Sequence, residues 1–223
     1  MAWVEVQHGP AKGLWLKLNP RTGHDYFQGA VEPEAQQALV EHLRAGMTVY
    51  DIGANIGFFS LLGARLVGTA GRVVAFEADP DAAARLKEHA ARNGFSWITV
   101  EEKAAWSETG EVRFVRSVPA TSPDLGLGHV QTDGAAEDSM GVAAVSLDDY
   151  AERAPAPDFV KCDVEGAEVE VVRGARRLLA EKRPNVLCEL HSEENRRILD
   201  EVFARLGYDC RSCGASHILA IPR

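Results

Sequence analysis

The sequence lacks any apolar run long enough to cross a bilayer. Runs such as Val186-Leu-Cys188 fall far short of the roughly 20 apolar residues that a membrane-spanning helix needs. The first residues, Met1-Ala-Trp-Val-Glu5, also lack the charged region and the apolar stretch of a secretory leader. We therefore expect a cytoplasmic protein that has no membrane partner.

Cysteine is scarce as well. Four cysteines in 223 residues do not make a disulfide framework. Cys162 and Cys188 lie in strand-like apolar runs, where free buried thiols are ordinary. Cys210 and Cys213 form a single C-x-x-C. Without a second such pair or a nearby pair of histidines, this spacing favours two ordinary thiols over a zinc site.

Positive charge is in deficit. Lysine and arginine number 24 against 33 aspartate and glutamate residues, which gives a net charge of −9. A negative chain is repelled by the phosphate backbone of a nucleic acid and by an anionic membrane face. These numbers favour a small-molecule acceptor and disfavour nucleic acid, and they leave the oligomeric state open.

What the sequence has is a regular alternation of elements. From Thr48 onward, short apolar runs alternate with segments of helical period, the pattern of a parallel sheet whose strands are joined by helices. The predicted strands are residues 48–52, 72–76, 98–101, 159–162 and 186–190. Helices are predicted over residues 56–67, from Pro80 (with Asp79 as N-cap) to a stop at Asn93-Gly94, after Gly166 as far as Leu179, and over residues 198–206. A final hairpin, residues 208–212 and 217–221, adds one antiparallel strand to the sheet.

We expect one α/β domain over residues 1–223, because a chain with 46% hydrophobic residues can bury one core and is too short for two substantial ones. Residues 1–47 are predicted to hold an N-terminal flap, packed on the main sheet, and a helix. Their elements are two short strands and the helix, at residues 3–6, 14–18 and 33–45. Residues 116–141 are rich in Ser, Pro, Gly and Asp, and a loop of that length predicts a lid insertion.

The segment Asp51-Ile-Gly-Ala-Asn-Ile-Gly57 ends the first of these strands in an acid, turns through glycines and opens a helix. In an open α/β sheet, ligands bind at the carboxyl ends of the strands. Glu77 closes the next strand, 20 residues beyond Gly57, where a carboxylate can accept both hydroxyls of a ribose. The two features together predict a nucleoside site rather than a bare tight turn.

The glycine spacing disfavours a nicotinamide dinucleotide. Counting from Gly53, the pattern G-x-G-x-x-G falls on Asn55 and Phe58, so the clearance that lets the backbone approach a pyrophosphate is missing. S-adenosylmethionine has no phosphate. Its ammonium and carboxylate suit Asp51 and Asn55, and its ribose suits Glu77. The sequence therefore predicts S-adenosylmethionine as cofactor.

Four segments resemble the FkbM family of methyltransferases: Asp51-Ile-Gly-Ala-Asn-Ile-Gly57, Ala75-Phe-Glu77, Ala104-Ala105-Trp-Ser107 and Lys161-Cys-Asp163-Val-Glu165-Gly-Ala-Glu168. The resemblance implies a Rossmann-like class I methyltransferase fold, a seven-stranded mostly parallel sheet with one antiparallel strand and helices on both faces. It also implies O-methylation with S-adenosylmethionine, often of sugars or of polyketide and peptide natural products. One departure is Ala78, where the family commonly has proline.

The resemblance also implies roles for individual residues. The methionine part of the cofactor would be lined by Asp51, Gly53, Asn55, Gly57 and Phe58. Glu77 would hold the ribose, Ala104 and Ala105 would lie beside the adenine, and Asp163 would lie near the ammonium. The segment from Tyr26 to Glu32 is either a flap that touches the cofactor through one of these two residues, or a helix entry with Glu32 beside the positive N-terminus.

A hydroxyl acceptor has to lose its proton, and residues after the fourth and fifth predicted strands can accept it. His191, Glu189 and Asp163 are the candidates, with an imidazole of ordinary pKa, about 6.5, suited to neutral pH. Glu168 falls in the first turn of a helix and favours a dipole role; Glu165 either caps that helix or faces substrate. The three candidates could alternatively bind a divalent cation, but no ligand spacing supports it, so we expect no metal.

These features predict an S-adenosylmethionine-dependent O-methyltransferase acting on a small-molecule hydroxyl, of a sugar or a natural product. N-methylation of a small molecule and a non-catalytic S-adenosylmethionine-binding module remain alternatives. A nucleic-acid amino-methyltransferase is disfavoured, because the turn after the fourth strand reads Asp163-Val-Glu-Gly166 rather than Asn-Pro-Pro-Tyr. The pockets of acceptors are built by variable loops, so the sequence does not identify the acceptor.

Overall fold

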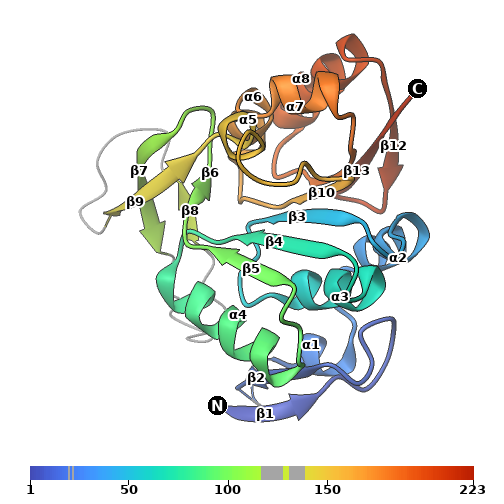
Figure 1. Ribbon diagram of the computed structural model, residues 1–223, viewed down its shortest axis with the longest axis vertical. Coiled ribbons are helices and arrows are strands. Elements are labelled where there is room, and N and C mark those ends of the chain that lie inside the picture. Colours follow the sequence, from blue (N-terminus) through green and yellow to red (C-terminus); the bar gives the residue numbers. More distant parts are fainter. Residues whose placement is uncertain (20, 22, 117–127, 131–138) are drawn as a thin grey trace.

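The computed structural model describes residues 1–19, 21, 23–116, 128–130 and 139–223 (Figure 1). Its centre is a seven-stranded sheet in the order β12-β13-β11-β10-β3-β4-β5. The strands are β3 (Thr48–Ile52), β4 (Arg72–Phe76), β5 (Ile98–Glu101), β10 (Phe159–Cys162), β11 (Asn185–Glu189), β12 (Tyr208–Cys213) and β13 (His217–Pro222). β13 pairs antiparallel with both of its neighbours, and the other pairs are parallel. The predicted strands and the single antiparallel strand are therefore confirmed.

Helices cover both faces of this sheet (Figure 1). One face carries α2 (Pro33–His42), α3 (Phe58–Val67) and α4 (Pro80–Arg92); the other carries α5 (Leu147–Tyr150), α6 (Glu168–Arg173), α7 (Arg176–Glu181) and α8 (Glu193–Arg205). Side chains alternate along a strand, so Val49 packs in the core under α3 while Tyr50 packs in the core under α6 and α8. Among the described residues, no helix combines the length and the apolar character that crossing a membrane requires.

Most predicted helices are found, with shifted ends. Asp79 caps α4 as predicted, since its side chain accepts hydrogen bonds from the backbone N–H groups of Asp81 and Ala82. The prediction of a single helix after Gly166 is wrong, because the structure has two short helices there, α6 and α7. A β-carbon at Gly174 would lie 2.0 Å from the carbonyl oxygen of Trp106. The helix is interrupted there by Asp148, whose N–H donates to the Gly174 carbonyl oxygen and whose carboxylate accepts from the N–H groups of Arg177 and Leu178.

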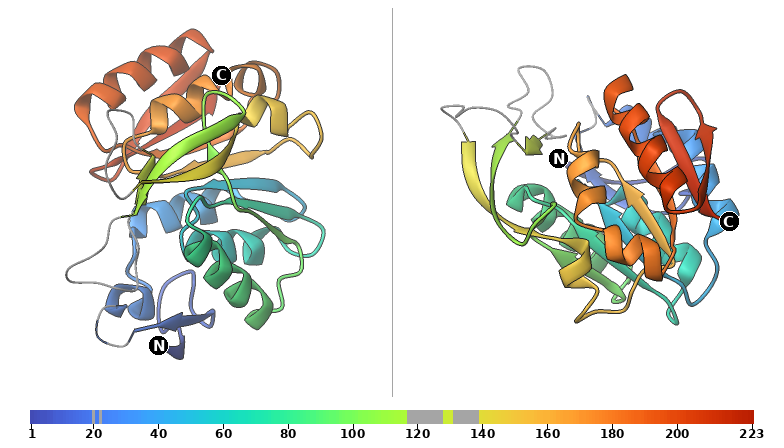
Figure 2. Two further views of the ribbon diagram at one scale, coloured as in Figure 1. Left: turned by 90° about the vertical axis from the view of Figure 1, so that its left-hand side faces the viewer. Right: turned by 90° about the horizontal axis from the view of Figure 1, so that it is seen from above.

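A second sheet stands at the carboxyl ends of β4 and β5, and in the left view of Figure 2 it faces the viewer. Its order is β6-β9-β7-β8. The strands are β6 (Ala104–Ala105), β7 (Gly110–Arg116), β8 (Gly128–Val130) and β9 (Ser139–Val145). Residues 128–130 and 139–141 thus belong to strands, where a loop was predicted. Gly128 lets β8 lie over the Phe114 ring, which a β-carbon would approach to 2.1 Å. Arg116, also part of the predicted lid, ends β7, and residues 117–127 and 131–138 lie outside the described residues.

The N-terminal segment forms a hairpin of β1 (Ala2–Glu5) and β2 (Trp15–Leu18), followed by α1 (His24–Gln28). The hairpin packs on α4 rather than directly on the main sheet, which corrects the prediction (Figure 1). The reason is that β2 has backbone N–H groups without a strand partner. That of Trp15 donates to Asn93 Oδ1 at 2.8 Å, and that of Lys17 donates to His89 Nε2 at 2.9 Å. All four cysteines are free thiols.

This junction predicts an acid-sensitive stability. His89 is fully buried, and its ring must accept from the Lys17 N–H while its Nδ1 lies 2.8 Å from the Ile56 carbonyl oxygen. Burial lowers the pKa of His89 to about 4. The unfolded chain, with a histidine pKa of about 6.5, binds more protons between these values, so stability is complete above about pH 6.5 and falls as the pH drops toward 4.

At about 1.4 kcal/mol per unit of pKa shift, we expect His89 to cost about 3 kcal/mol of unfolding free energy over this range. Urea denaturation at a series of pH values measures it. His89→Gln should flatten the profile, and His8→Gln, at an exposed position, is the matched control. An unchanged profile in His89→Gln would assign the acid sensitivity to other groups.

Candidate functional site

A cleft opens at the carboxyl ends of β3, β4, β10 and β11, with the second sheet as its far wall. Nine of the predicted residues line it: Glu32, Gly53, Asn55, Glu77, Ala104, Ala105, Asp163, Glu189 and His191. Asp51, Gly57, Phe58 and Glu168 do not belong to its lining. The strand register therefore gathers the acids as predicted, but part of the first motif lies behind the cleft.

The glycines of the first motif are required by the shape of the backbone. Gly53 has a φ of 74°, and a β-carbon there would lie 1.8 Å from the carbonyl oxygen of Asp163. Gly57 has a φ of 88°, and a β-carbon there would lie 2.5 Å from Leu86 of α4. Both positions demand glycine to bring β3 against β10 and α3 against α4. Gly57 thus packs on a helix instead of lining the cleft as predicted.

Phe58 also lies behind the cleft. Its ring is buried and meets the ring of Tyr26 edge-on, with centroids 5.5 Å apart. Tyr26 itself lines the cleft. Phe58 therefore does not line the cleft as predicted, and its ring packs against Tyr26, which does.

Glu77 and Asn55 form the centre of the cleft floor. Glu77 Oε2 accepts from the Asn55 N–H at 2.6 Å, and Oε1 accepts from the Asp79 N–H at 2.7 Å. Burial raises the pKa of Glu77 to about 7. Asn55 adopts the left-handed φ of 48°, which asparagine tolerates, and its side-chain oxygen Oδ1 is buried with no hydrogen-bond partner among the described residues. A carboxylate and an orphaned amide oxygen thus face the place where a polar ligand would lie.

Asp51 lies beneath this floor. It is 1% exposed, and Ser60 of α3 donates a hydrogen bond to its Oδ2 at 2.5 Å. Burial raises the pKa of Asp51, and the neighbouring Lys161 opposes that shift. Asp51 therefore fixes α3 to β3 and does not belong to the cleft lining, where the sequence predicted it.

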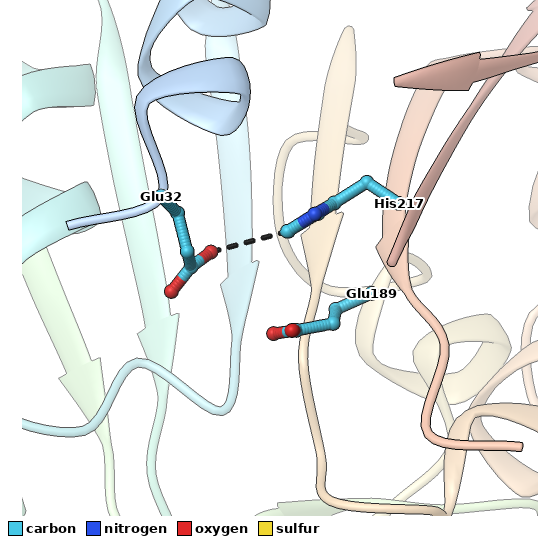
Figure 3. Close-up of side chains that lie close together, drawn as sticks. All are labelled: Glu32, Glu189 and His217. Atoms are coloured by element: carbon cyan, nitrogen blue, oxygen red, sulfur yellow. Dashed lines mark hydrogen bonds and ion pairs between the residues drawn. The ribbon is translucent and has the colours of Figure 1, made fainter. Parts of the chain in front are cut away.

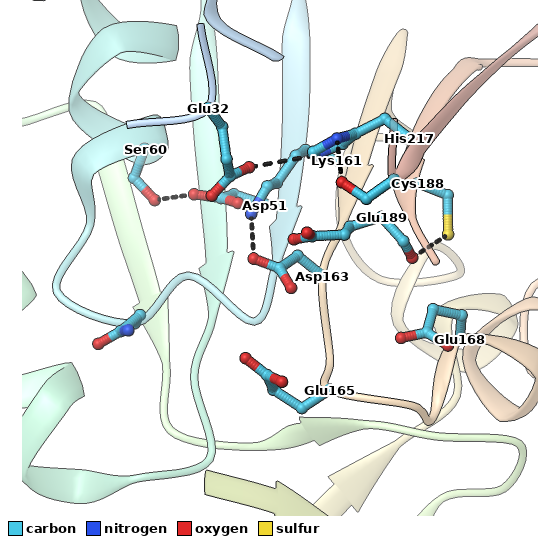
Figure 4. A network of polar contacts seen from close by, with 12 residues as sticks. Glu32, Asp51, Ser60, Lys161, Asp163, Glu165, Glu168, Cys188, Glu189 and His217 are labelled. Atoms are coloured by element: carbon cyan, nitrogen blue, oxygen red, sulfur yellow. Dashed lines mark hydrogen bonds and ion pairs between the residues drawn. The ribbon is translucent and has the colours of Figure 1, made fainter. Parts of the chain in front are cut away.

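Lys161 is a residue that the sequence analysis quoted in a motif without giving it a role. It is 3% exposed, and its Nζ donates to Asp163 Oδ2 at 2.9 Å (Figure 4). The pattern alone contains a signal for it. All four residues of β10 are buried, so a lysine inside that strand needs a buried acid.

His191 lies at the rim among three carboxylates. Its Nδ1 donates to Glu168 Oε1 at 2.7 Å, and its Nε2 lies 3.4 Å from Glu165 Oε2 and 3.8 Å from Asp163 Oδ1. The hydrogen bond that His191 donates to Glu168 raises the pKa of His191 to about 9, against the desolvation that lowers it. The predicted ordinary pKa is therefore wrong. At neutral pH the ring is a cation and has no site that accepts a proton.

Glu168 holds His191 in place. Its side chain is fully buried, and besides His191 it accepts from the Gly166 N–H at 2.8 Å and from Asn195 Nδ2 at 2.5 Å. It begins α6, as the dipole interpretation predicted. Glu165 does not cap this helix, because the N-cap residue is Ala167; its side chain lines the cleft instead.

Glu32 lines the cleft as well, and it also stands at the entry of a helix, so both features of its two interpretations are present. It occupies the N-cap position of α2 but makes no side-chain cap bond. Its Oε2 instead pairs with His217 Nε2 at 3.1 Å (Figure 3). Glu189 points toward the same place in Figure 3, and burial raises its pKa. His217 comes from β13, and nothing in the sequence pattern linked it to Glu32.

Two groups of side chains in the cleft have the composition of cation ligands. Glu32, Glu189 and His217 form one group, and Asp163, Glu189 and His191 form the other, with ligand atoms of each group within 4.8 Å of one another. Lys161 and the protonated His191 already supply positive charge to these acids. The expectation of a metal-free site stays a prediction.

The Methyltransferase FkbM domain family matches residues 51–214. The chain belongs to this family. Among curated proteins, it is similar to the hexuronic acid methyltransferase AglP of Haloferax volcanii, at 31% identity over 163 residues, which cover 72% of this chain and 63% of AglP. The chain thus spans less than two thirds of that FkbM relative.

Solved structures share the fold. The methyltransferase FkbM from Methylobacillus flagellatus KT superposes with a TM-score of 0.55 at 21% identity, over 83% of this chain and 50% of that one. Fibrillarin from Aeropyrum pernix, solved with natively bound S-adenosyl-L-methionine, superposes with a TM-score of 0.52 at 15% identity, over 83% of this chain and 72% of that one. The FkbM chain therefore has the Rossmann-like fold of class I methyltransferases.

Proposed function

We propose that the protein is an S-adenosylmethionine-dependent O-methyltransferase that acts on a hydroxyl group of a small molecule, a sugar or a natural product. The observation that carries this proposal is the pairing of Glu77 with Asn55 at the floor of the cleft. Family membership supports the methyl transfer, and a relative that is named for a hexuronic acid supports a sugar as acceptor.

The residues present fit this cofactor. Glu77 offers its carboxylate to the ribose hydroxyls, and Asn55 Oδ1, which has no partner of its own, offers an acceptor to the methionine end. Asp163 faces the same end and suits the ammonium. Ala104, which packs with Phe114, and Ala105 present only methyl groups to the cleft, which leaves an apolar slot for a flat purine.

A small-molecule acceptor suits the charge of the walls. Five acids line the cleft, namely Glu32, Glu77, Asp163, Glu165 and Glu189, against the two basic residues Lys103 and His191. Lys103 is paired with Glu101, and His191 with Glu168. A nucleic-acid backbone would meet repulsion here, whereas carboxylates accept hydrogen bonds from the hydroxyls of a sugar.

When bound, S-adenosylmethionine supplies a methyl group on a positively charged sulfur. The chain has to align the acceptor oxygen with that methyl group and take up the hydroxyl proton. Glu189 is the base we assign, because its raised pKa lies closer to neutral pH than that of an ordinary carboxylate and its oxygens face the cleft. The cationic His191 next to Asp163 and Glu165 orients these carboxylates.

Ligand binding tests this proposal directly. S-adenosylhomocysteine at about a hundred times its dissociation constant is expected to add about 2.7 kcal/mol to the unfolding free energy, seen as a raised midpoint in thermal denaturation. NAD at the same concentration should leave the midpoint unchanged. Stabilisation by NAD alone, or by neither ligand, would contradict the proposed function.

A further inference from the structure

Lys161 is a buried cation that the proposed chemistry does not use. Its side chain is 4% exposed in the middle of the main sheet, and among the described residues it is the one lysine or arginine that is buried. Taking an ammonium out of water costs several kcal/mol unless acids surround it. What surrounds Lys161 therefore indicates what it does.

Acids from three elements surround this ammonium. Asp163 follows β10 and accepts from Nζ at 2.9 Å, while Asp51 lies directly opposite Lys161 in the pairing of β3 with β10. Glu32, at the start of α2, acts on it from the third side. The ring of Phe59 closes the pocket, with its centroid 4.6 Å from Nζ. Figure 4 shows the ammonium between these carboxylates, directly behind the cleft wall.

Asp163 depends on this cation. Burial favours its protonated form, whereas Lys161, His191 and a hydrogen bond shared with Glu189 favour its ionised form. Burial by itself raises the pKa of Asp163, but Lys161, and after it His191, more than offset that effect and hold the pKa below its ordinary value. The hydrogen bond to Oδ2 also fixes the carboxylate, so that Oδ1 remains directed toward the rim, 3.8 Å from His191.

We propose that Lys161 is a positioning residue for cofactor binding, which holds the Asp163 carboxylate ionised and oriented from behind the cleft wall. The proposal rests on the proposed function, because it assigns Asp163 to the cofactor ammonium. Lys161 touches neither cofactor nor acceptor, since it does not line the cleft.

The test measures the affinity for S-adenosylmethionine by calorimetry between about pH 6 and pH 8.5, in wild type and in Lys161→Met. Glu77 titrates within this range in both proteins, so the readout is the ratio of the two dissociation constants at each pH. Without the cation the pKa of Asp163 is expected to rise, and each unit of that rise removes up to about tenfold of the ionised form at the acid end of the range. We expect a ratio of at least about tenfold at pH 6 that shrinks toward one at pH 8.5.

Lys161→Arg keeps the charge and should hold the ratio near one throughout. Lys103→Met removes a lysine that lines the cleft but is paired with Glu101, so its ratio should not depend on pH. A merely structural role for Lys161 would weaken binding equally at every pH. A pH-independent ratio for Lys161→Met therefore overturns the proposal, while a wild-type protein that binds no S-adenosylmethionine overturns the proposed function itself.

A second measurement does not depend on the variant folding. Carbon-13 NMR of labelled aspartate, with Asp163→Asn used for assignment, follows the titration of Asp163 in the wild type. We expect its midpoint below the ordinary aspartate value of about 3.9. A midpoint at or above that value would show that Lys161 does not hold the carboxylate ionised, and would overturn the proposal.

Discussion

Replacing Glu77 with alanine is expected to lower the affinity for S-adenosylmethionine by at least about a hundredfold. A carboxylate that accepts both ribose hydroxyls makes two charge-assisted hydrogen bonds, each worth about 1.5 to 3 kcal/mol. Glu77 is 8% exposed, so water replaces the missing oxygens poorly. Calorimetric titration of the variant measures the loss.

The same substitution also destabilises the fold, which the sequence alone did not indicate. Glu77 accepts from the backbone N–H groups of Asn55 and Asp79, and alanine leaves both buried donors without a partner, at about 1 to 3 kcal/mol each. Ser146→Ala is the control, because it removes the N-cap of α5 outside the cleft lining. It should lower stability and leave the affinity alone. Full affinity in Glu77→Ala would remove the ribose assignment.

Glu189→Gln is expected to lower turnover by about 10² to 10⁴, the usual contribution of a general base. Glutamine keeps the shape of the side chain but does not take up the proton of the acceptor hydroxyl. The affinity for S-adenosylmethionine should change by less than about threefold, since the assigned cofactor contacts are Glu77, Asn55 and Asp163. The rate is measured as the formation of methylated acceptor at saturating S-adenosylmethionine.

The pH profile separates this role from that of His191. A base is active when deprotonated, so the wild-type rate should rise with pH through the raised pKa of Glu189, and Glu189→Gln should lose that rise. Above about pH 9, His191 loses its charge and no longer orients its carboxylate neighbours, so the rate should fall. Glu168→Gln should bring this alkaline fall to lower pH, because it removes the largest cause of the raised pKa of His191. Full turnover in Glu189→Gln would place the base elsewhere.

Local sequence patterns predicted the strands, because the apolar run of a strand and the residues that end it are consecutive in the sequence. The same logic placed Glu77 and Asp163 at one edge of the sheet, since parallel strands end together. The contacts that were not predicted join residues far apart in the sequence. The partner of Glu32 is His217, and that of Glu168 is Asn195, from segments that no short motif connects to them.

The pKa of His191 could not be predicted for the same reason. It is set by three carboxylates on the turn after β10 and at the start of α6, which reach His191 only when β10 and β11 pair. Lys161 was within reach of sequence reasoning, because a charged residue in a fully buried strand demands a partner. The assignments of individual residues to the cofactor, and the single domain over residues 1–223, stay predictions.

The contact of Gly53 with the Asp163 carbonyl bears on how relatives are recognised in genomes. A descendant that had lost methyl transfer but kept the fold would still need glycine at this position and at Gly57, because both are demanded by packing. The two glycines therefore indicate the fold and do not indicate the catalytic activity. Asn55 and Glu77 offer polar groups to the cleft, so their replacement, with the glycines retained, is what would mark such a pseudoenzyme.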